Sequence, residues 1–274
     1  GEIYGARAAL HMWEEPCISG TKGSGAVFFS GCGLRCCFCQ NHDIAIGSRG
    51  RAVSVERLGE IFLELKEKGA ANINLVTGAH YVPQIIEALD MARRNGLDIP
   101  VVYNSSGYEK TETLKLLEGY VDIYLPDLKY LDPELAQKFS YAPDYVQAAK
   151  AAIGEMVRQT GKCEFGEDGY IRKGTIVRHL ILPGHTGNSI KALRYLHETY
   201  GEDIYISIMN QYTPVRKFVE FKELNRKVTK REYEKVLDAA VDMGIQNGFI
   251  QEGETASESF IPDFDYEGVE KNTP

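Results

Sequence analysis

The sequence predicts an α/β fold with a parallel sheet, because short apolar runs alternate with amphipathic helical patterns along most of the chain. The chain has 274 residues, which is enough to bury a sizeable core. No linker rich in proline, glycine and serine divides it. We therefore expect one domain over residues 1–274, with a core at about 24–210 and a C-terminal helix and acidic loop at 229–274. Both an open doubly wound sheet and a complete or partial barrel would satisfy right-handed crossovers at this spacing.

Six predicted strands are short apolar runs that end at turn residues or polar residues. The first run ends at Gly31 and the second at Gly78. Strands are expected at 26–30, 72–77, 99–103, 121–125, 175–182 and 204–209, with a further short strand at 249–251. Helices are expected at 54–69, 83–96, 111–117, 133–139, 144–158, 190–200 and 230–243, and the segment 162–174 is expected to form a hairpin or a loop.

Composition and charge exclude several classes of protein. Hydrophobic residues make up 43% of the chain and charged residues 26%, values typical of a globular protein rather than a disordered one. The formal net charge of −8 disfavours binding of nucleic acid or of an anionic membrane through bulk charge. No apolar run approaches the roughly 18–20 residues that span a bilayer, and the first residues do not resemble a signal peptide. We expect a cytoplasmic protein that has neither nucleic acid nor membrane as a partner.

The cysteines indicate a metal site rather than a disulfide framework. Four of the six cysteines, Cys32, Cys36, Cys37 and Cys39, fall within eight residues of one another. Disulfide-rich secreted domains spread their cysteines along the chain and are usually much shorter. Clustered thiols in a cytoplasmic chain favour metal binding. We expect the thiols outside the metal site to be Cys17, Cys37 and Cys163, which have no ligand spacing.

Cys32, Cys36 and Cys39 follow a C-x3-C-x2-C spacing directly after the first predicted strand. Three thiolates on one tight loop can bind three irons of a cubane iron–sulfur cluster and leave the fourth iron open to a substrate or cosubstrate. A structural zinc site would need a fourth ligand nearby. His42 does not follow zinc-site spacing, and Cys37, adjacent to Cys36, would point elsewhere.

This cysteine motif, with the aromatic Phe38 before its last cysteine, resembles the fingerprint of the radical S-adenosylmethionine (SAM) enzymes. The resemblance implies a 4Fe–4S cluster whose open iron binds SAM, and cleavage of SAM to a 5′-deoxyadenosyl radical that abstracts hydrogen. It also implies a partial (β/α)6 TIM-like barrel with parallel strands. The chain is most similar to the pyruvate formate-lyase-activating-enzyme-like branch. The similar stretches are 13–20, 25–41, 74–83, 121–129 and 249–264.

The resemblance implies a SAM-binding shell at the strand ends. The family's Gly-Gly-Glu segment, which binds the methionine amino group, corresponds here to Gly78, Ala79 and His80 after Thr77. The acidic residue is absent, so the backbone would supply these contacts. A partly exposed histidine at a helix start is the alternative for His80.

Polar residues after the third and fourth strands resemble two further family segments. Asn104 and Ser105 stand where activating enzymes carry Asp and Thr, and would suit ribose hydroxyls or a monovalent cation; a simple turn is the alternative. Asp127 and Lys129 resemble the family's Leu-Asp-Leu-Lys segment and share one side of a strand. They would bind the ribose and carboxylate of SAM, with a structural ion pair as the alternative.

The fifth and sixth strands contribute the remaining candidates. Arg178 would suit a carboxylate in the barrel mouth, whereas His179 on the opposite side is expected to be packed or on the surface. The family's Tyr-His pair at the sixth strand is missing its histidine, and Gln211 or Tyr212 would replace it.

The resemblance implies a radical SAM enzyme that abstracts hydrogen, and the similar branch implies a glycine of a glycyl radical enzyme as the source of that hydrogen. The alternatives are radical modification of another peptide or a small molecule and, in a different class, a non-enzymatic iron–sulfur electron carrier. A carrier would close all four iron positions with protein ligands. An electron donor such as flavodoxin or ferredoxin is the expected partner, and no side chain is assigned as catalytic. We also expect residues 251–264, apolar at both ends, to cover the barrel mouth.

Overall fold

A mostly parallel sheet forms the centre of the protein in a computed structural model, which describes residues 2–250, 262 and 264–270. The strands within these residues are β1 (Ile3–His11), β2 (Ser24–Phe29), β3 (Arg51–Val53), β4 (Ile73–Val76), β5 (Val101–Ser105), β6 (Ile123–Pro126), β7 (Glu164–Phe165), β8 (Ile171–Leu180), β9 (Tyr205–Met209) and β10 (Gly248–Ile250). They follow the order β10-β9-β8-β6-β5-β4-β2-β1-β3, and β7 pairs with β8.

All strands from β2 to β10 along this path are parallel to their neighbours, and they include the six strands predicted from the sequence. In the described part of the chain, the antiparallel pairs are β1 with β2, β1 with β3, and β7 with β8. Within the described residues, β10 and β3 are the two ends of the sheet, so hydrogen bonds do not close it. The predicted α/β fold with parallel strands is confirmed, and the open sheet has the topology of a partial barrel.

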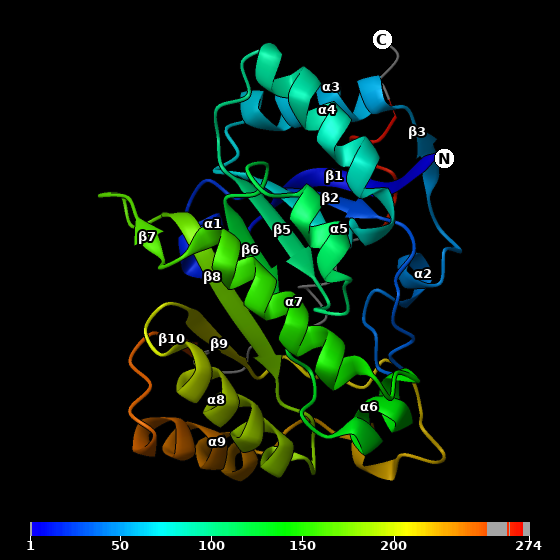
Figure 1. The fold of residues 1–274 in the computed structure, drawn as a ribbon. Helices are drawn as coiled ribbons and strands as arrows, with labels where there is room; N and C mark the ends of the chain where they lie inside the picture. Colours follow the sequence, from blue (N-terminus) through cyan, green and yellow to red (C-terminus); the bar gives the residue numbers. More distant parts are fainter. Residues whose placement is uncertain (1, 251–261, 263, 271–274) are drawn as a thin grey trace.

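Helices follow most of the parallel strands, and Figure 1 shows them around the sheet, from α3 and α4 at the top of the view through α5 and α7 to α8 and α9 at the bottom. The helices of the described chain are α1 (Pro16–Ser19), α2 (His42–Ala45), α3 (Val55–Glu67), α4 (Val82–Arg94), α5 (Thr111–Leu116), α6 (Pro133–Ser140), α7 (Tyr145–Thr160), α8 (Thr186–Tyr200) and α9 (Lys230–Asp242), with 3-10 turns η1 (Ala79–Tyr81) and η2 (Lys222–Asn225). Each of these is too short or too polar to cross a membrane.

Helix α3 shows how the local sequence determines where a helix begins and which of its faces is buried. The Ser54 hydroxyl caps the helix by accepting a hydrogen bond from a backbone N–H of the first turn at 3.1 Å. Leu58, Ile61, Phe62 and Leu65 then recur at helical spacing and are all buried against the sheet. The apolar stripe predicted from the sequence is therefore the face that packs.

Strands β1 and β3 and the early start of β8 were not predicted. Strand β1 pairs with β2 and β3 and has a weak apolar pattern, because its buried positions Ala6, Ala8 and Ala9 are small. Strand β8 begins at Ile171, before the predicted strand 175–182, because its start pairs with β7 in the hairpin expected at 162–174. These differences add antiparallel pairing at positions where hydrophobic periodicity is weak.

Gly107, in the turn after β5, has no room for a side chain. Its φ is +75°, and a Cβ there would lie 2.4 Å from the carbonyl oxygen of Asp127. The turn therefore brings the backbone after β5 directly against the residue that follows β6.

We expect Gly107→Ala to lower the free energy of unfolding by about 2–4 kcal/mol, because the left-handed φ and the backbone clash act together. Gly119→Ala is the matched control, since Gly119 has a φ of +81° but no atom within 4 Å of its Cβ position. Gly119→Ala should lower the free energy of unfolding by about 1 kcal/mol. Urea denaturation of both variants measures the difference between their free energies of unfolding. Equal losses of stability in the two variants would contradict a clash at Gly107.

Candidate active site

A cavity of about 240 Å³ lies among the strand ends and the loops that follow them. Eleven of the fourteen residues predicted for the cluster and the SAM shell line it. They are Cys32, Cys36, Phe38, Cys39, Thr77, Asn104, Ser105, Asp127, Lys129, Arg178 and Gln211. The structure thus brings together candidates from six separate segments of the sequence.

Gly78, Ala79 and His80 are not in the lining of this cavity. Thr77, with a φ of +62°, is the last residue after β4 to reach it, so the left-handed turn comes one residue before Gly78. Gly78 instead packs closely on the side chain of Ile85. His80 lies beside Gly31, where a Cβ would come within 3.0 Å of the imidazole ring.

The cysteine loop between β2 and α2 is pinned by its backbone. The Cys32 N–H donates to the carbonyl oxygen of Ala45 at 3.0 Å, and the Cys37 N–H donates to that of Phe139 at 2.8 Å. One end of the loop is therefore held by α2 and its middle by α6. The loop has a defined shape that its own short sequence does not specify.

The side chains of Cys32, Cys36 and Cys39 line the cavity, whereas Cys37 is buried and does not. The Ser140 hydroxyl donates to the Cys36 sulfur at 3.0 Å. Burial raises the pKa of Cys32, and raises that of Cys39 to about 12, so burial favours the neutral form of both thiols.

Three thiols facing one cavity fit a cubane cluster better than a single ion. No group of three His, Cys, Asp or Glu side chains within the described ranges is arranged around one metal ion. In a cubane, each of three thiolates binds a different iron, so the sulfurs stand farther apart than around one zinc. The donor set therefore fits a cluster with one open iron.

A charged group lies opposite the cysteines. Asp127 accepts hydrogen bonds from Arg178 Nε at 2.9 Å and from Lys129 Nζ at 2.6 Å. Burial alone would raise the pKa of Asp127, but the two cations more than offset it and hold that pKa below its usual range. The predicted structural pair exists, and all three side chains also line the cavity.

Glu14 was not predicted and joins this group from the segment after β1. It pairs with Arg178 Nη1 at 3.3 Å and accepts from the amides of Asn74 and Asn104 at 3.1 and 3.2 Å. Arg178 Nη2 donates to the Asn104 side-chain oxygen at 2.6 Å. Glu14 and Glu15 are adjacent acidic residues in the stretch 13–20. They lie far from Arg178 in sequence, so the contact could not be predicted.

Glu109 is a second carboxyl that sequence analysis missed. It accepts a hydrogen bond from the Ser105 hydroxyl at 2.7 Å and one from Tyr103 at 3.2 Å. Burial raises the pKa of Glu109 to about 7, although these hydrogen bonds act in the opposite direction. Glu109 therefore fixes the orientation of the Ser105 hydroxyl at the cavity wall.

The ends of β8 and β9, the fifth and sixth strands predicted from the sequence, differ in the side chains that they contribute to the cavity. His179 is fully buried, and its ring nitrogens bond Leu128 O at 2.6 Å and Ser189 Oγ at 2.9 Å, as expected for a packed histidine. Burial lowers the pKa of His179 to about 4, so it is neutral. Gln211 and Tyr212 both line the cavity, and the hydroxyl of the buried Tyr212 donates to Leu224 O at 2.7 Å.

Aromatic side chains form part of the lining of the cavity. His11, Trp13 and Phe28 are among them, and Trp13 is 56% exposed. Pro262 also lines the cavity. The ring of Phe264 packs edge-on against the ring of Phe28, with 5.6 Å between the ring centroids. Residues 251–261 and 263 of the predicted cover lie outside the described part of the chain.

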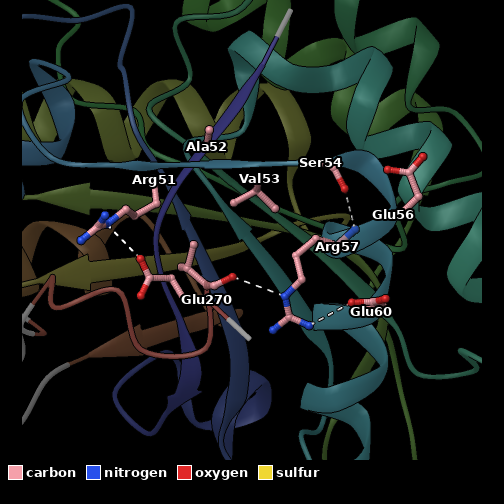
Figure 2. A pocket seen from close by; sticks show the side chains of 9 residues that line it. Arg51, Ala52, Val53, Ser54, Glu56, Arg57, Glu60 and Glu270 are labelled. Carbon is pink, nitrogen blue, oxygen red and sulfur yellow. Dashed lines mark hydrogen bonds and ion pairs between the residues drawn. The ribbon is translucent and has the colours of Figure 1, made fainter. Parts of the chain in front are cut away.

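A separate pocket, which Figure 2 shows, belongs to the attachment of the C-terminal segment. Arg57 donates to the carbonyl oxygens of Val269 at 3.3 Å and Gly268 at 3.1 Å, and Arg51 pairs with Glu270 at 3.1 Å. The pocket is lined by residues of β3, the start of α3 and this segment. None of the predicted site residues is among them.

The sequence profile described as the radical SAM superfamily matches residues 26–196, and the chain belongs to this superfamily. The protein is accordingly a radical SAM enzyme, with a 4Fe–4S cluster and SAM as cofactors. An uncharacterized protein of Methanocaldococcus jannaschii is 28% identical over 246 residues, 87% of this chain and 67% of that protein. The pyruvate formate-lyase-activating enzyme of Clostridium pasteurianum is 27% identical over 113 residues, 39% of this chain and 46% of the enzyme.

Solved structures show the same fold. SuiB of Streptococcus suis, bound to the precursor peptide SuiA, superimposes with a TM-score of 0.55 at 15% identity, covering 82% of this chain and 47% of SuiB. The FeFe-hydrogenase maturase HydG of Carboxydothermus hydrogenoformans superimposes with a TM-score of 0.55 at 13% identity, covering 84% of this chain and 54% of HydG. The chain thus spans about half the length of these two proteins.

We expect Cys32→Ala, Cys36→Ala and Cys39→Ala each to abolish assembly of the cluster, because each thiolate would bind a different iron. Cys37→Ala is the matched control on the same loop and should leave iron and sulfide content unchanged. Iron and sulfide analysis after anaerobic reconstitution measures both. Equal loss of iron in all four variants would contradict the assignment.

Proposed function

We propose that this radical SAM enzyme abstracts hydrogen from a polypeptide, and that its substrate is a glycine of a glycyl radical enzyme. The observation that carries the proposal is an exposed aromatic side chain in the lining of a small polar cavity. Trp13 is 56% exposed there, and Phe28 and Pro262 line the same cavity. A surface of this kind suits a protein partner that remains outside while one segment enters.

The similarity to the activating enzyme of Clostridium pasteurianum supports the same choice, since that protein acts on pyruvate formate-lyase by its name. SuiB, which has the same fold, binds a precursor peptide. Both support a polypeptide substrate, and the first supports a glycyl radical enzyme among such substrates.

In this proposal Cys32, Cys36 and Cys39 hold the cluster. The cluster and SAM supply the 5′-deoxyadenosyl radical that takes the hydrogen atom. Lys129 and Arg178 present donors to the cavity while Asp127 balances their charge, an arrangement suited to the carboxylate and ribose of SAM.

The other assignments in the SAM shell follow the lining of the cavity. Thr77, rather than Gly78, Ala79 or His80, lines it after β4. Asn104 and Ser105 are held by Glu14 and Glu109, so they are oriented before a ligand binds. The remaining predicted contacts are Phe38 and Gln211.

A non-enzymatic electron carrier fits this arrangement poorly. Of the six cysteines, Cys17 and Cys163 pack in a different apolar cluster, with Ile18 and Ile176, and Cys37 does not line the cavity. A carrier that closes all four iron positions with thiolates would need a fourth cysteine at the cavity.

We expect Lys129→Met to weaken SAM binding about tenfold or more while the cluster still assembles, because a charged donor in a buried site is lost. Lys191→Met, at an exposed position on α8, is the control for loss of a lysine charge. Equilibrium dialysis with labelled SAM on the reconstituted protein measures the affinity. Unchanged affinity in Lys129→Met would leave Lys129 and Asp127 as a structural ion pair only.

The function is tested by following deuterium. The reduced enzyme and SAM are added to a protein fraction from cells grown on deuterated glycine, and to the small-molecule fraction of the same extract. We expect deuterium in 5′-deoxyadenosine from the protein fraction alone, and none with Cys36→Ala. Transfer only from the small-molecule fraction would favour a small-molecule substrate, and transfer only from proteins labelled at residues other than glycine would favour another peptide modification.

A further inference from the structure

The sulfur of Cys36 accepts a hydrogen bond from a side chain far away in the sequence. The donor is the hydroxyl of the buried Ser140, the last residue of α6, at 3.0 Å. In the neighbouring pair of residues, the Cys37 N–H donates to the carbonyl oxygen of Phe139 at 2.8 Å. The end of α6 is therefore fixed against the cysteine loop at the point where the hydroxyl meets the sulfur.

A second hydroxyl stands behind the first. The hydroxyl oxygens of Tyr130 and Ser140 lie 2.8 Å apart, and Tyr130 is fully buried. A cysteine that binds iron is a thiolate, which has no proton and can only accept a hydrogen bond. The one proton of the Ser140 hydroxyl then points at Cys36, so Tyr130 has to be the donor to Ser140. The result is a chain of two donors that ends on the Cys36 sulfur.

The other two predicted cluster ligands take hydrogen bonds from the backbone. The N–H of Leu34 donates to the Cys32 sulfur, and the N–H of Asn41 donates to the Cys39 sulfur. In both, the donor lies two residues after the cysteine, so it comes with the loop itself. The hydroxyl on Cys36 comes from a different element, and a single substitution can remove it.

We propose that Ser140, supported by Tyr130, raises the reduction potential of the iron–sulfur cluster through its hydrogen bond to Cys36. A donor on a thiolate ligand withdraws negative charge from the sulfur. The reduced cluster carries one more negative charge than the oxidised one, so the hydrogen bond stabilises the reduced form more. Ser140 acts through Cys36 and is therefore a positioning residue.

The surroundings make this hydrogen bond count. Tyr130 belongs to an apolar cluster that also contains Phe38 and Phe139, and hydrogen bonds are electrostatically stronger in such an environment than in water. Adding an electron to a cluster in a partly buried site is costly unless donors face the extra charge. Lys129 also lines the cavity, but Asp127 at 2.6 Å already balances its charge.

The test compares the midpoint potential of the cluster in the wild-type protein and in Ser140→Ala. Both are reconstituted anaerobically and titrated without SAM, and the reduced cluster is followed by its electron paramagnetic resonance signal. We expect the equilibrium constant for one-electron reduction to fall about threefold to tenfold, which lowers the midpoint potential by about 30–60 mV.

Ser24→Ala is the matched control. Ser24 is a fully buried serine at the start of β2, and its hydroxyl donates to the Asn72 side-chain oxygen at 2.6 Å. This variant should keep the wild-type potential. A potential in Ser140→Ala that is unchanged or raised, or lowered equally in both variants, would overturn the proposal. If Ser140 merely held the loop, the variant would assemble fewer clusters, but those clusters would keep the wild-type potential.

If Ser140→Ala does not assemble its cluster, Tyr130→Phe takes its place. It removes the second donor and leaves the Ser140 hydroxyl, so the potential should fall by less and in the same direction. Tyr124→Phe is then the control, since the buried Tyr124 bonds Gln159 on α7 at 2.5 Å. An unchanged potential in Tyr130→Phe would then overturn the proposal. The titration needs neither SAM nor substrate, so its outcome is independent of the proposed hydrogen abstraction.

Discussion

The buried guanidinium of Arg178 is the interaction on which the interior of the site depends. It bonds Asp127 after β6, Asn104 on β5 and Glu14 after β1, so one side chain ties three segments to β8. Backbone pairing between Asp127 and Arg178 extends the sheet at the same point. Removing one member of such a buried ion pair costs about 3–5 kcal/mol, because its partner remains buried and unpaired. The polar floor of the cavity is thus fixed before any ligand binds.

The cysteine loop is held in a different way. No strand pairing supports it; backbone hydrogen bonds to Ala45 and Phe139 hold it, together with the Ser140 hydroxyl on Cys36. Cys32, Cys36 and Cys39 line the cavity, whereas Cys37 of the same loop does not.

Sequence patterns predicted the parts of this arrangement that depend on local periodicity. The six parallel strands and the shared cavity of the cysteines with Asp127 and Lys129 follow from apolar runs and from the position of polar residues at strand ends. Glu14 and Glu109 could not be predicted, since each gains its role from contacts between segments. The placement of His80 also depends on a backbone detail, because the left-handed turn falls at Thr77.

The size of the cavity constrains the proposed substrate. At about 240 Å³ it is below the roughly 300–1,000 Å³ typical of small-molecule sites, and the cluster and SAM would both have to fit in it. A substrate would then have to share a cavity whose lining includes His11, Trp13 and Phe28. A narrow segment of backbone can do so while the rest of its protein stays outside. Glycine, which has no side chain, is the residue whose Cα would meet the least obstruction there.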